Sequence, residues 1–200
     1  MRGIGIKATC IGIFVNLMLF FIKLYIGISA NSLAVYCDAV NNLGDTLSCA
    51  VALAGFFALK RLDEKKANRL QSLCTFVIEL VITFTGGYFV YNGLERLLYP
   101  LPVTYSKKYA VLIAVTVLVK ALMAVMYKAF NKKANSAVLK AMILDSVLDC
   151  FITLFALMSL ILVAKVNYAV DGVFAIITGS AITVTAIREL ISQVKYLIND

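Results

Sequence analysis

Long apolar runs separated by short polar interruptions dominate the pattern along the chain. As a helix, about 20 apolar residues cross the roughly 30 Å of a bilayer's hydrocarbon core. The runs are continuous rather than alternating, which favours helices over strands, and a helix satisfies its own backbone hydrogen bonds in lipid. We therefore predict an all-α membrane protein with six transmembrane helices, at roughly 6–28, 33–59, 71–97, 108–130, 136–164 and 169–192.

The polar interruptions are short and contain no linker that would separate a second domain. The longest, KRLDEKKANR at 60–69, is interpreted as a solvated turn, and both prolines lie in YPLPV at 99–103, where they end a helix. The segment LIND closes the sequence shortly after the last run. We therefore expect residues 1–200 to form a single transmembrane domain, with no C-terminal cytoplasmic domain.

Composition and charge support this interpretation. Hydrophobic residues make up 62% of the 200 residues and charged residues only 15%, against roughly half and a quarter in soluble domains. The net charge of +8 comes mainly from basic residues near both termini, at 60–69 and at 128–133. The positive-inside rule then places both termini in the cytoplasm. A nucleic-acid role is disfavoured, because no basic surface accompanies a fold that would present it.

The chain contains no histidine. This removes the usual imidazole ligand for zinc and the usual proton shuttle, and no nucleophile–base pair of an enzyme is visible. The cysteines form no CxxC pair and are interpreted mainly as apolar core residues. Cys37 and Cys150 flank the acidic stretches described next, so they remain possible additional ligands or path-lining residues.

Two apolar stretches carry polar residues at matching positions, NSLAVYCDAVNNLGDTLSCAVAL at 31–53 and NSAVLKAMILDSVLDCFITLFAL at 135–157. Residues four apart lie on one helix face, so Asn41 and Asp45 point the same way, as do Asp145 and Asp149. Both stretches fit the pattern N-S-x8-[N/D]-x3-D, and the predicted topology makes them antiparallel, as in inverted transporter repeats. Packed together, the two faces would bring four oxygen-bearing side chains to one place.

The energetic cost of these acids indicates what they do. An acid alone at mid-membrane costs about 2.5–3.5 kcal/mol, and three cost about 8–10 kcal/mol before their mutual repulsion. A bound cation or a wet cavity would offset that cost. Polar contacts between helices contribute only about 0.6 kcal/mol on average. The one basic residue near in sequence, Lys140, lies on a different face from Asp145. We therefore expect the acids to lack a basic partner, which favours an ion site.

Other intramembrane polar residues have less certain roles. Asp38 lies on nearly the same stripe as the acid pair of its helix but further out, so both lining of an exit path and a structural role stay open. Asn42 is expected to bridge helices. Lys23 and Lys120 are expected to snorkel or to pair internally, with Glu79 a candidate partner for one of them.

Several stretches resemble the transmembrane part of the cation diffusion facilitator family, the divalent-metal/proton antiporters. VNLMLFFIKLYIGISANSLAVYCDAVNNLGDTLS resembles that family's first two helices, YFVYNGLERLLYPLPV the end of its third, NSAVLKAMILDSVLDCFITL its fifth and AVDGVFAIITGSAI the start of its sixth. The resemblance covers nearly the whole chain. It implies a transport site of two x-x-x-Asp pairs, here Asn41 with Asp45 and Asp145 with Asp149.

The resemblance also implies a homodimer that exports a divalent metal ion from the cytoplasm by alternating access. Zinc members usually carry a histidine in one pair, and most members of the family continue into a cytoplasmic metal-binding domain; this sequence has neither feature. Members with an asparagine in the first position resemble manganese exporters. Oxygen ligands also suit manganese, whereas zinc favours nitrogen and sulfur. We predict Mn2+ as the transported ion, then Zn2+ and Fe2+, and no permanently bound cofactor.

Without histidine, proton coupling is expected to run through Asp45, Asp145 and Asp149 themselves. The sequence thus predicts a divalent metal cation efflux transporter, not an enzyme, in the plasma membrane of a bacterium. The alternative is a metal-independent membrane scaffold or assembly subunit whose intramembrane acids are structural. Metal uptake into inverted vesicles would separate these two classes.

Overall fold

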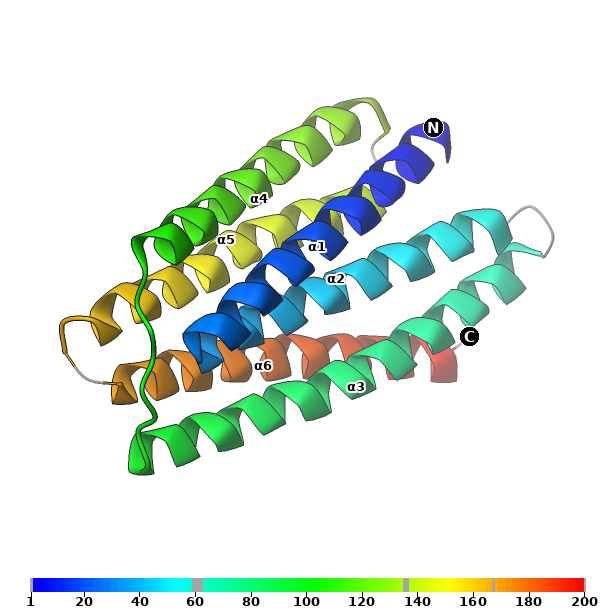
Figure 1. Ribbon diagram of the computed structural model, residues 1–200. Coiled ribbons are helices and arrows are strands. Elements are labelled where there is room, and N and C mark those ends of the chain that lie inside the picture. Colours follow the sequence, from blue (N-terminus) through cyan, green and yellow to red (C-terminus); the bar gives the residue numbers. More distant parts are fainter. Residues whose placement is uncertain (1, 59–62, 135–136, 167, 200) are drawn as a thin grey trace.

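The computed structural model describes residues 2–58, 63–134, 137–166 and 168–199, and this part of the chain forms six helices. The helices are α1 (Arg2–Ala30), α2 (Leu33–Ala58), α3 (Glu64–Leu98), α4 (Lys107–Ala134), α5 (Ala137–Val163) and α6 (Ala169–Asn199). They form one bundle of long helices (Figure 1). Both chain ends lie at the end of the bundle where α2 finishes and α3 begins.

Each predicted span corresponds to one helix, although α1, α3, α4 and α6 extend beyond the apolar runs. The clearest extension is α3, which begins at Glu64 rather than at 71 because EKKANRL is polar but rich in good helix formers. Similarly, α6 continues to Asn199. The predicted span ends at 59 and 136 lie outside the described residues.

Within the described residues, five helices are long and apolar enough to cross a membrane, namely α1, α3, α4, α5 and α6. The helix α2 falls short because Asp38, Asn41, Asn42 and Asp45 lower its hydropathy. It nevertheless packs against α1, α3, α5 and α6. Its polar residues therefore lie inside the bundle and not on a surface facing lipid or water.

A polar cluster fixes the corner between α1 and α2. Asn31 adopts the left-handed conformation with φ 54°, which asparagine tolerates better than most residues. Asp171 on α6 accepts hydrogen bonds from Ser32 Oγ at 2.6 Å and from the backbone N–H of Leu33 at 2.7 Å. Arg96 on α3 adds an ion pair to Asp171 at 2.9 Å. The start of α2 is thereby tied to α3 and α6.

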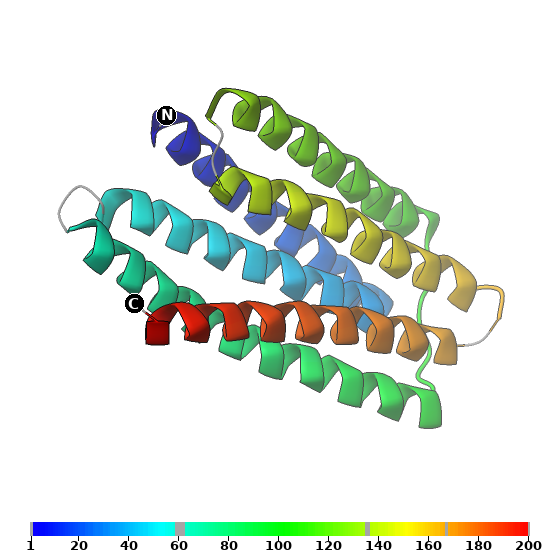
Figure 2. The same cartoon turned by 180° about the vertical axis from the view of Figure 1, so that it is seen from behind.

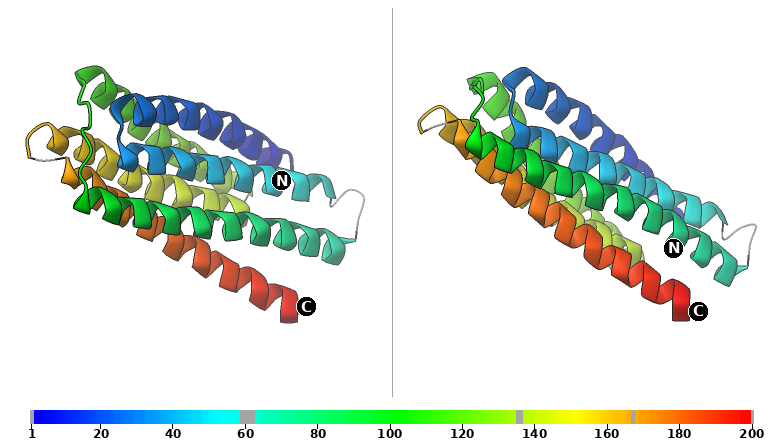
Figure 3. Two further views of the ribbon diagram at one scale, coloured as in Figure 1. Left: turned by 60° about the horizontal axis from the view of Figure 1, so that its bottom comes forward. Right: turned by 90° about the horizontal axis from the view of Figure 1, so that it is seen from below.

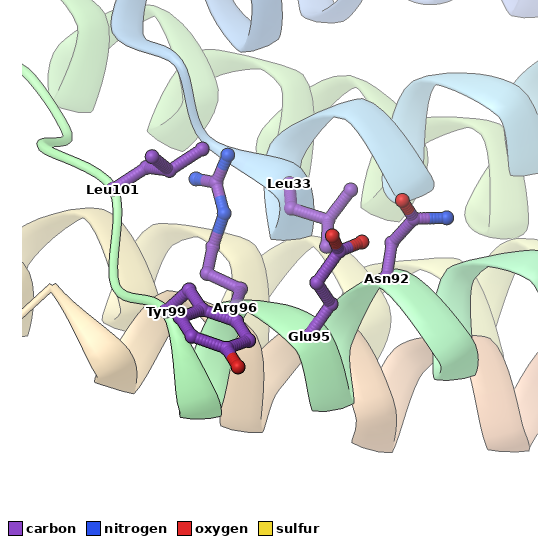
Figure 4. Close-up of a pocket in the computed structure, with 6 residues that line it drawn as sticks. All are labelled: Leu33, Asn92, Glu95, Arg96, Tyr99 and Leu101. Atoms are coloured by element: carbon purple, nitrogen blue, oxygen red, sulfur yellow. The ribbon is translucent and has the colours of Figure 1, made fainter.

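A hollow of about 230 Å³ lies beside this corner, between α2, α3 and the segment that follows α3 (Figure 4). In Figure 4 the Arg96 guanidinium points toward the start of α2. It is committed to Asp171 and to the backbone oxygen of Asn31, so its charge is already compensated. The hollow is part of the packing at this end of the bundle, and its lining residues are Leu33, Asn92, Glu95, Arg96, Tyr99 and Leu101.

The helices α3 and α6 pack side by side over most of their length (Figure 3). Pairs of glycines spaced seven residues apart allow this close approach. A Cβ at Gly172 would lie 2.7 Å from the backbone oxygen of Gly93, and a Cβ at Gly179 would lie 2.9 Å from that of Gly86. Small residues of this kind let membrane helices approach closely. Larger side chains at these positions would force the two helices apart.

Candidate functional site

The two helices that carry the predicted acid pairs run antiparallel through the bundle, with α5 lying between α2 and α4 (Figures 1 and 2). Each pair lies near the middle of its helix. The Asn41 side chain on α2 donates from Nδ2 to Oδ1 of Asp149 on α5, at 2.6 Å. Asp45, Asp145 and Asp149 line one cavity. The structure therefore brings the two predicted faces together. The Asn135–Ser136 part of the repeat pattern lies outside the described residues.

A lysine from a third helix lies between the acids. Lys120, near the middle of α4, donates from Nζ to Asp45 Oδ2 at 2.9 Å and also to Asp149 Oδ2. A third bond goes to Asn16 Oδ1 on α1, at 2.8 Å. The Lys120 side chain is only 1% exposed. Four helices, α1, α2, α4 and α5, thus contribute to a single buried polar cluster.

The expectation that the acids lack a basic partner is wrong. It considered only Lys140, which is exposed, as a partner for the acids. Lys120 was expected to snorkel or to pair internally, but it was not connected with these acids because it is far from both pairs in sequence. The helix α4 packs against α5 and α1, and the long lysine side chain reaches across to α2. An ionisable residue inside a span is itself a sign of function, so the sequence held a signal for Lys120. Asn16 is likewise a polar residue inside a predicted span, which is a similar but weaker sign of function.

Lys23 pairs with a different acid. Its Nζ lies 2.8 Å from Asp38 Oδ1, and both side chains are fully buried. Thr153 on α5 accepts from Lys23 at 2.8 Å and donates to Asp38 at 3.2 Å. Among the described ion pairs none joins Lys23 or Lys120 to Glu79, so the suggested pairing of Glu79 with a lysine is not observed.

Asp38 belongs to this second cluster and not to the cavity lining. Asn42 donates to the Asp38 backbone oxygen at 2.7 Å, which ties the amide to its own helix. Among the described side chains, Asp38 Oδ2 and Asn42 Oδ1 are buried without a hydrogen-bond partner. Of the two roles left open for Asp38, this conformation supports the structural one, because a buried ion pair that loses one partner is costly, about 3–5 kcal/mol.

The cavity associated with the acids has a volume of about 210 Å³. It extends from Asn16 and Lys120, at the middle of the bundle, to Gln71 and Gln193, near the end of the bundle that holds both chain termini. The cavity therefore offers a route, lined by both polar and apolar side chains, from near that end to the acid pairs. Its other lining residues are Asp45, Ser48, Cys49, Ala52, Thr75, Tyr127, Val138, Ala141, Met142, Asp145, Ser146, Asp149 and Glu189.

One cysteine lines this cavity, but it is neither of the two that the sequence singled out. Cys37 is buried in an apolar cluster with Phe89 and Ile182, and Cys150 donates to the Ser146 backbone oxygen at 3.2 Å. Neither lines the cavity, whereas Cys49 does. Cys49 lies four residues after Asp45, so the helical spacing that links Asn41 to Asp45 also predicts its position. The sequence reasoning overlooked this continuation.

In this conformation the oxygen atoms of the predicted metal ligands Asp45 and Asp149 are arranged around the Lys120 ammonium group. Asp149 has both oxygens engaged, Oδ1 by Asn41 and Oδ2 by Lys120. Among the described residues, no group of three or more His, Cys, Asp or Glu side chains is arranged to hold a metal ion. For Asp45 and Asp149 to hold a metal together, Lys120 would have to move. Asn41 would also have to turn its carbonyl oxygen toward the ion.

A bundle of apolar helices around a cavity that contains charged side chains defines an integral, multi-pass membrane protein. Residues 9–198 match the model of the cation efflux transmembrane domain, so the chain belongs to the cation efflux family. This confirms the resemblance to cation diffusion facilitators at the level of the family. The family consists of transporters that export divalent metal cations, and it is not an enzyme family. A search of curated proteins finds no significant match to the chain.

Proposed function

We propose that this protein exports Mn2+ from the cytoplasm in exchange for protons, by alternating access, with Asn41, Asp45, Asp145 and Asp149 as the metal ligands. The observation that carries the proposal is that the two polar helix faces meet where the cavity reaches the middle of the bundle. Carboxylates at the inner end of a cavity within the bundle are suited to receive a cation from one side of the membrane.

The proposed topology has six membrane spans and cytoplasmic termini, in the plasma membrane of a bacterium. Both chain ends and the basic 63–69 segment at the start of α3 lie at the same end of the bundle, as the positive-inside rule requires (Figures 1 and 3). The cavity extends to this end. We therefore infer that the structure is an inward-facing conformation. The helix α2 is the sixth span, because it runs alongside the other five within the bundle.

The choice of Mn2+ rests on the chemistry of the ligands. The proposed ligands offer one amide and three carboxylates, and these are hard oxygen donors that suit manganese. Zinc binds oxygen too, yet it gains most from nitrogen and sulfur. Cys37 and Cys150 face away from the cavity. Cys49 lines it one turn from Asp45, and its thiol is a sulfur donor that would favour zinc or iron, the less preferred substrates.

The metal-independent scaffold remains the competing function, and one observation favours it. Lys120 gives Asp45 and Asp149 a shared internal partner, so the charge of these two acids is compensated in part without a metal. Asp145, however, lines the cavity and takes part in none of the described ion pairs. Reconstituted vesicles decide between the two functions. A transporter should accumulate Mn2+ well above protein-free vesicles, and a scaffold should not.

Transport is expected to depend on a proton gradient. Asp149 is buried, Asp45 is half-buried and Asp145 is exposed, and all three carboxylates line the same cavity. Carboxylates that share a cavity repel each other once a metal ion leaves. We therefore expect them to take up protons as the metal departs. The test is Mn2+ uptake into vesicles with and without an imposed pH gradient. A rate that is indifferent to the gradient would rule out proton exchange.

We further propose that the transporter is a homodimer held together by membrane helices. The helix α3 supports this, because it presents exposed large apolar side chains along much of its length, including Val77, Phe84, Tyr88, Tyr91 and Leu98. Lipid or a second copy can cover such a face. Chemical crosslinking in mild detergent should trap dimers, and recovery of monomers alone would count against this assembly.

A further inference from the structure

Lys120 occupies the place where the proposed metal ligands meet. Its Nζ contacts oxygens from three helices: Asn16 Oδ1 at 2.8 Å, Asp45 Oδ2 at 2.9 Å, and Asp149 Oδ2. The side chain is 1% exposed. An ammonium group surrounded by oxygens is in the environment that a bound cation would have. In this conformation, the cation site is filled by a cation of the protein itself.

A metal ion and this ammonium group cannot hold the same oxygens at once. Divalent metals bind oxygen ligands at about 2.0–2.2 Å, so a metal bound to Asp45 and Asp149 would displace Nζ from these carboxylates. The two positive charges would also repel each other strongly in a cavity with little water. Metal binding must therefore work against the contacts that Lys120 makes now.

Asn16 gives the displaced ammonium group a partner. It lies on α1, is 3% exposed, and is not among the proposed metal ligands. Its Oδ1 already accepts from Lys120. When the carboxylates turn to a metal ion, Lys120 can keep this hydrogen bond. The lysine is thus held close to the site in both states.

We propose that Lys120 is a tethered cation that competes with the transported metal for Asp45 and Asp149, weakening metal binding and speeding metal release. Asn16 acts as its positioning residue. Once the metal has left, Lys120 fills the site. The empty transporter can then change conformation while an ammonium group partly compensates the charge of its buried acids. This inference rests on the proposed function, because it takes the metal ligands from there.

The test is a direct titration of the purified full-length protein in detergent with MnCl2. Lys120→Met keeps the length of the side chain and removes its charge, so Mn2+ should bind about ten-fold tighter or more. Uptake at saturating Mn2+ should be slower, because release is slower. The matched control is the double variant Lys23→Met/Asp38→Asn, which removes the other buried lysine pair. It should bind Mn2+ within about two-fold of the wild type.

Asn16→Leu provides a second variant with the opposite sign, and it serves if Lys120→Met does not fold. Without Asn16 the displaced ammonium group has no partner, so Mn2+ should bind more weakly. If Lys120 and Asn16 had only a structural role, the two variants would not change the affinity for Mn2+ in opposite directions. Unchanged or weaker Mn2+ binding in folded Lys120→Met would overturn the inference, as would unchanged or tighter binding in Asn16→Leu.

A third variant separates this inference from the proposed function. Asp149→Asn should greatly weaken Mn2+ binding if the ligand set is right. If Asp149→Asn binds Mn2+ like the wild type, the ligand set is wrong and the role of Lys120 falls with it. If Asp149→Asn loses binding and Lys120→Met does not gain it, the ligands stand and only the competition by Lys120 is wrong.

Discussion

Replacing Asp149 with alanine is expected to abolish Mn2+ transport. Asp149 is the acid on which the cluster converges, since Asn41 from α2 and Lys120 from α4 both donate to it. Changes to residues that merely support metal ligands already cost about 10–100-fold. Loss of the carboxylate itself should therefore reduce uptake by about 100-fold or more. The measurement is initial Mn2+ uptake into vesicles at matched protein levels, and Asp45→Ala should have a similar effect.

Controls must separate loss of the site from loss of the fold. Asp149→Ala leaves Lys120 with Asp45 and Asn16, so part of its compensation remains. Glu95→Ala removes an exposed acid at the end of the bundle opposite the chain termini, and this variant should transport Mn2+ normally. Each variant should run as a single species in size-exclusion chromatography. Normal uptake by well-folded Asp149→Ala would place the transport site elsewhere.

The positions of the helices along the chain were largely predictable from the sequence, and the reason is physical. A bilayer requires apolar runs of a certain length, and helices are the simplest way to satisfy the backbone within it. These requirements are local, so hydropathy reveals them. The helix α2 is instructive because its hydropathy falls short, yet the polar face that lowers it is directed into the bundle. The acids on α2 indicated that it carries the candidate site more clearly than its hydropathy indicated that it spans the membrane.

The candidate site was predictable only in part. The spacing of Asn41 with Asp45, and of Asp145 with Asp149, is a local property of a helix, and it predicted that the two faces meet. In the structure Asn41 contacts Asp149, and the three acids line one cavity. The partners of the acids are not a local property. Lys120 joins them because α4 packs beside α5 and a flexible side chain reaches across to α2. No periodicity within α4 specifies which neighbour that lysine will meet.

The same limit applies to the other buried charges. Asp38 appeared to lie on the stripe of its helix that faces the path, but Lys23 on α1 and Thr153 on α5 draw it into a separate cluster. Asp171 was not singled out at all, although it fixes the start of α2. In both cases the partner comes from a distant helix. The sequence identified several of the charged residues within the helices, and the packing of the bundle decided which of them are buried and which of them meet.

Asn41→His is expected to shift selectivity from Mn2+ toward Zn2+. Asn41 now donates from Nδ2 to Asp149 Oδ1 at 2.6 Å. A neutral histidine can donate from one ring nitrogen to Asp149 and present the other to a metal. A carboxylate that accepts from a metal-bound histidine is the arrangement that orients the ring and strengthens its bond to zinc. The substitution therefore adds the nitrogen ligand that zinc prefers while keeping the existing contact.

The size of this shift can be bounded. One added nitrogen ligand that is worth about 1.4 kcal/mol to zinc relative to manganese changes the ratio of their affinities about ten-fold. Competitive uptake of Mn2+ and Zn2+ by the wild type and by Asn41→His measures that ratio directly. Asn41→Asp is the matched control, because it adds a fourth carboxylate and raises the affinity for both ions without adding nitrogen. If the wild type carries Zn2+ well and Mn2+ not at all, the argument from oxygen ligands is wrong. A Zn2+/Mn2+ ratio that rises in Asn41→His but not in Asn41→Asp would place residue 41 among the ligands that choose the metal.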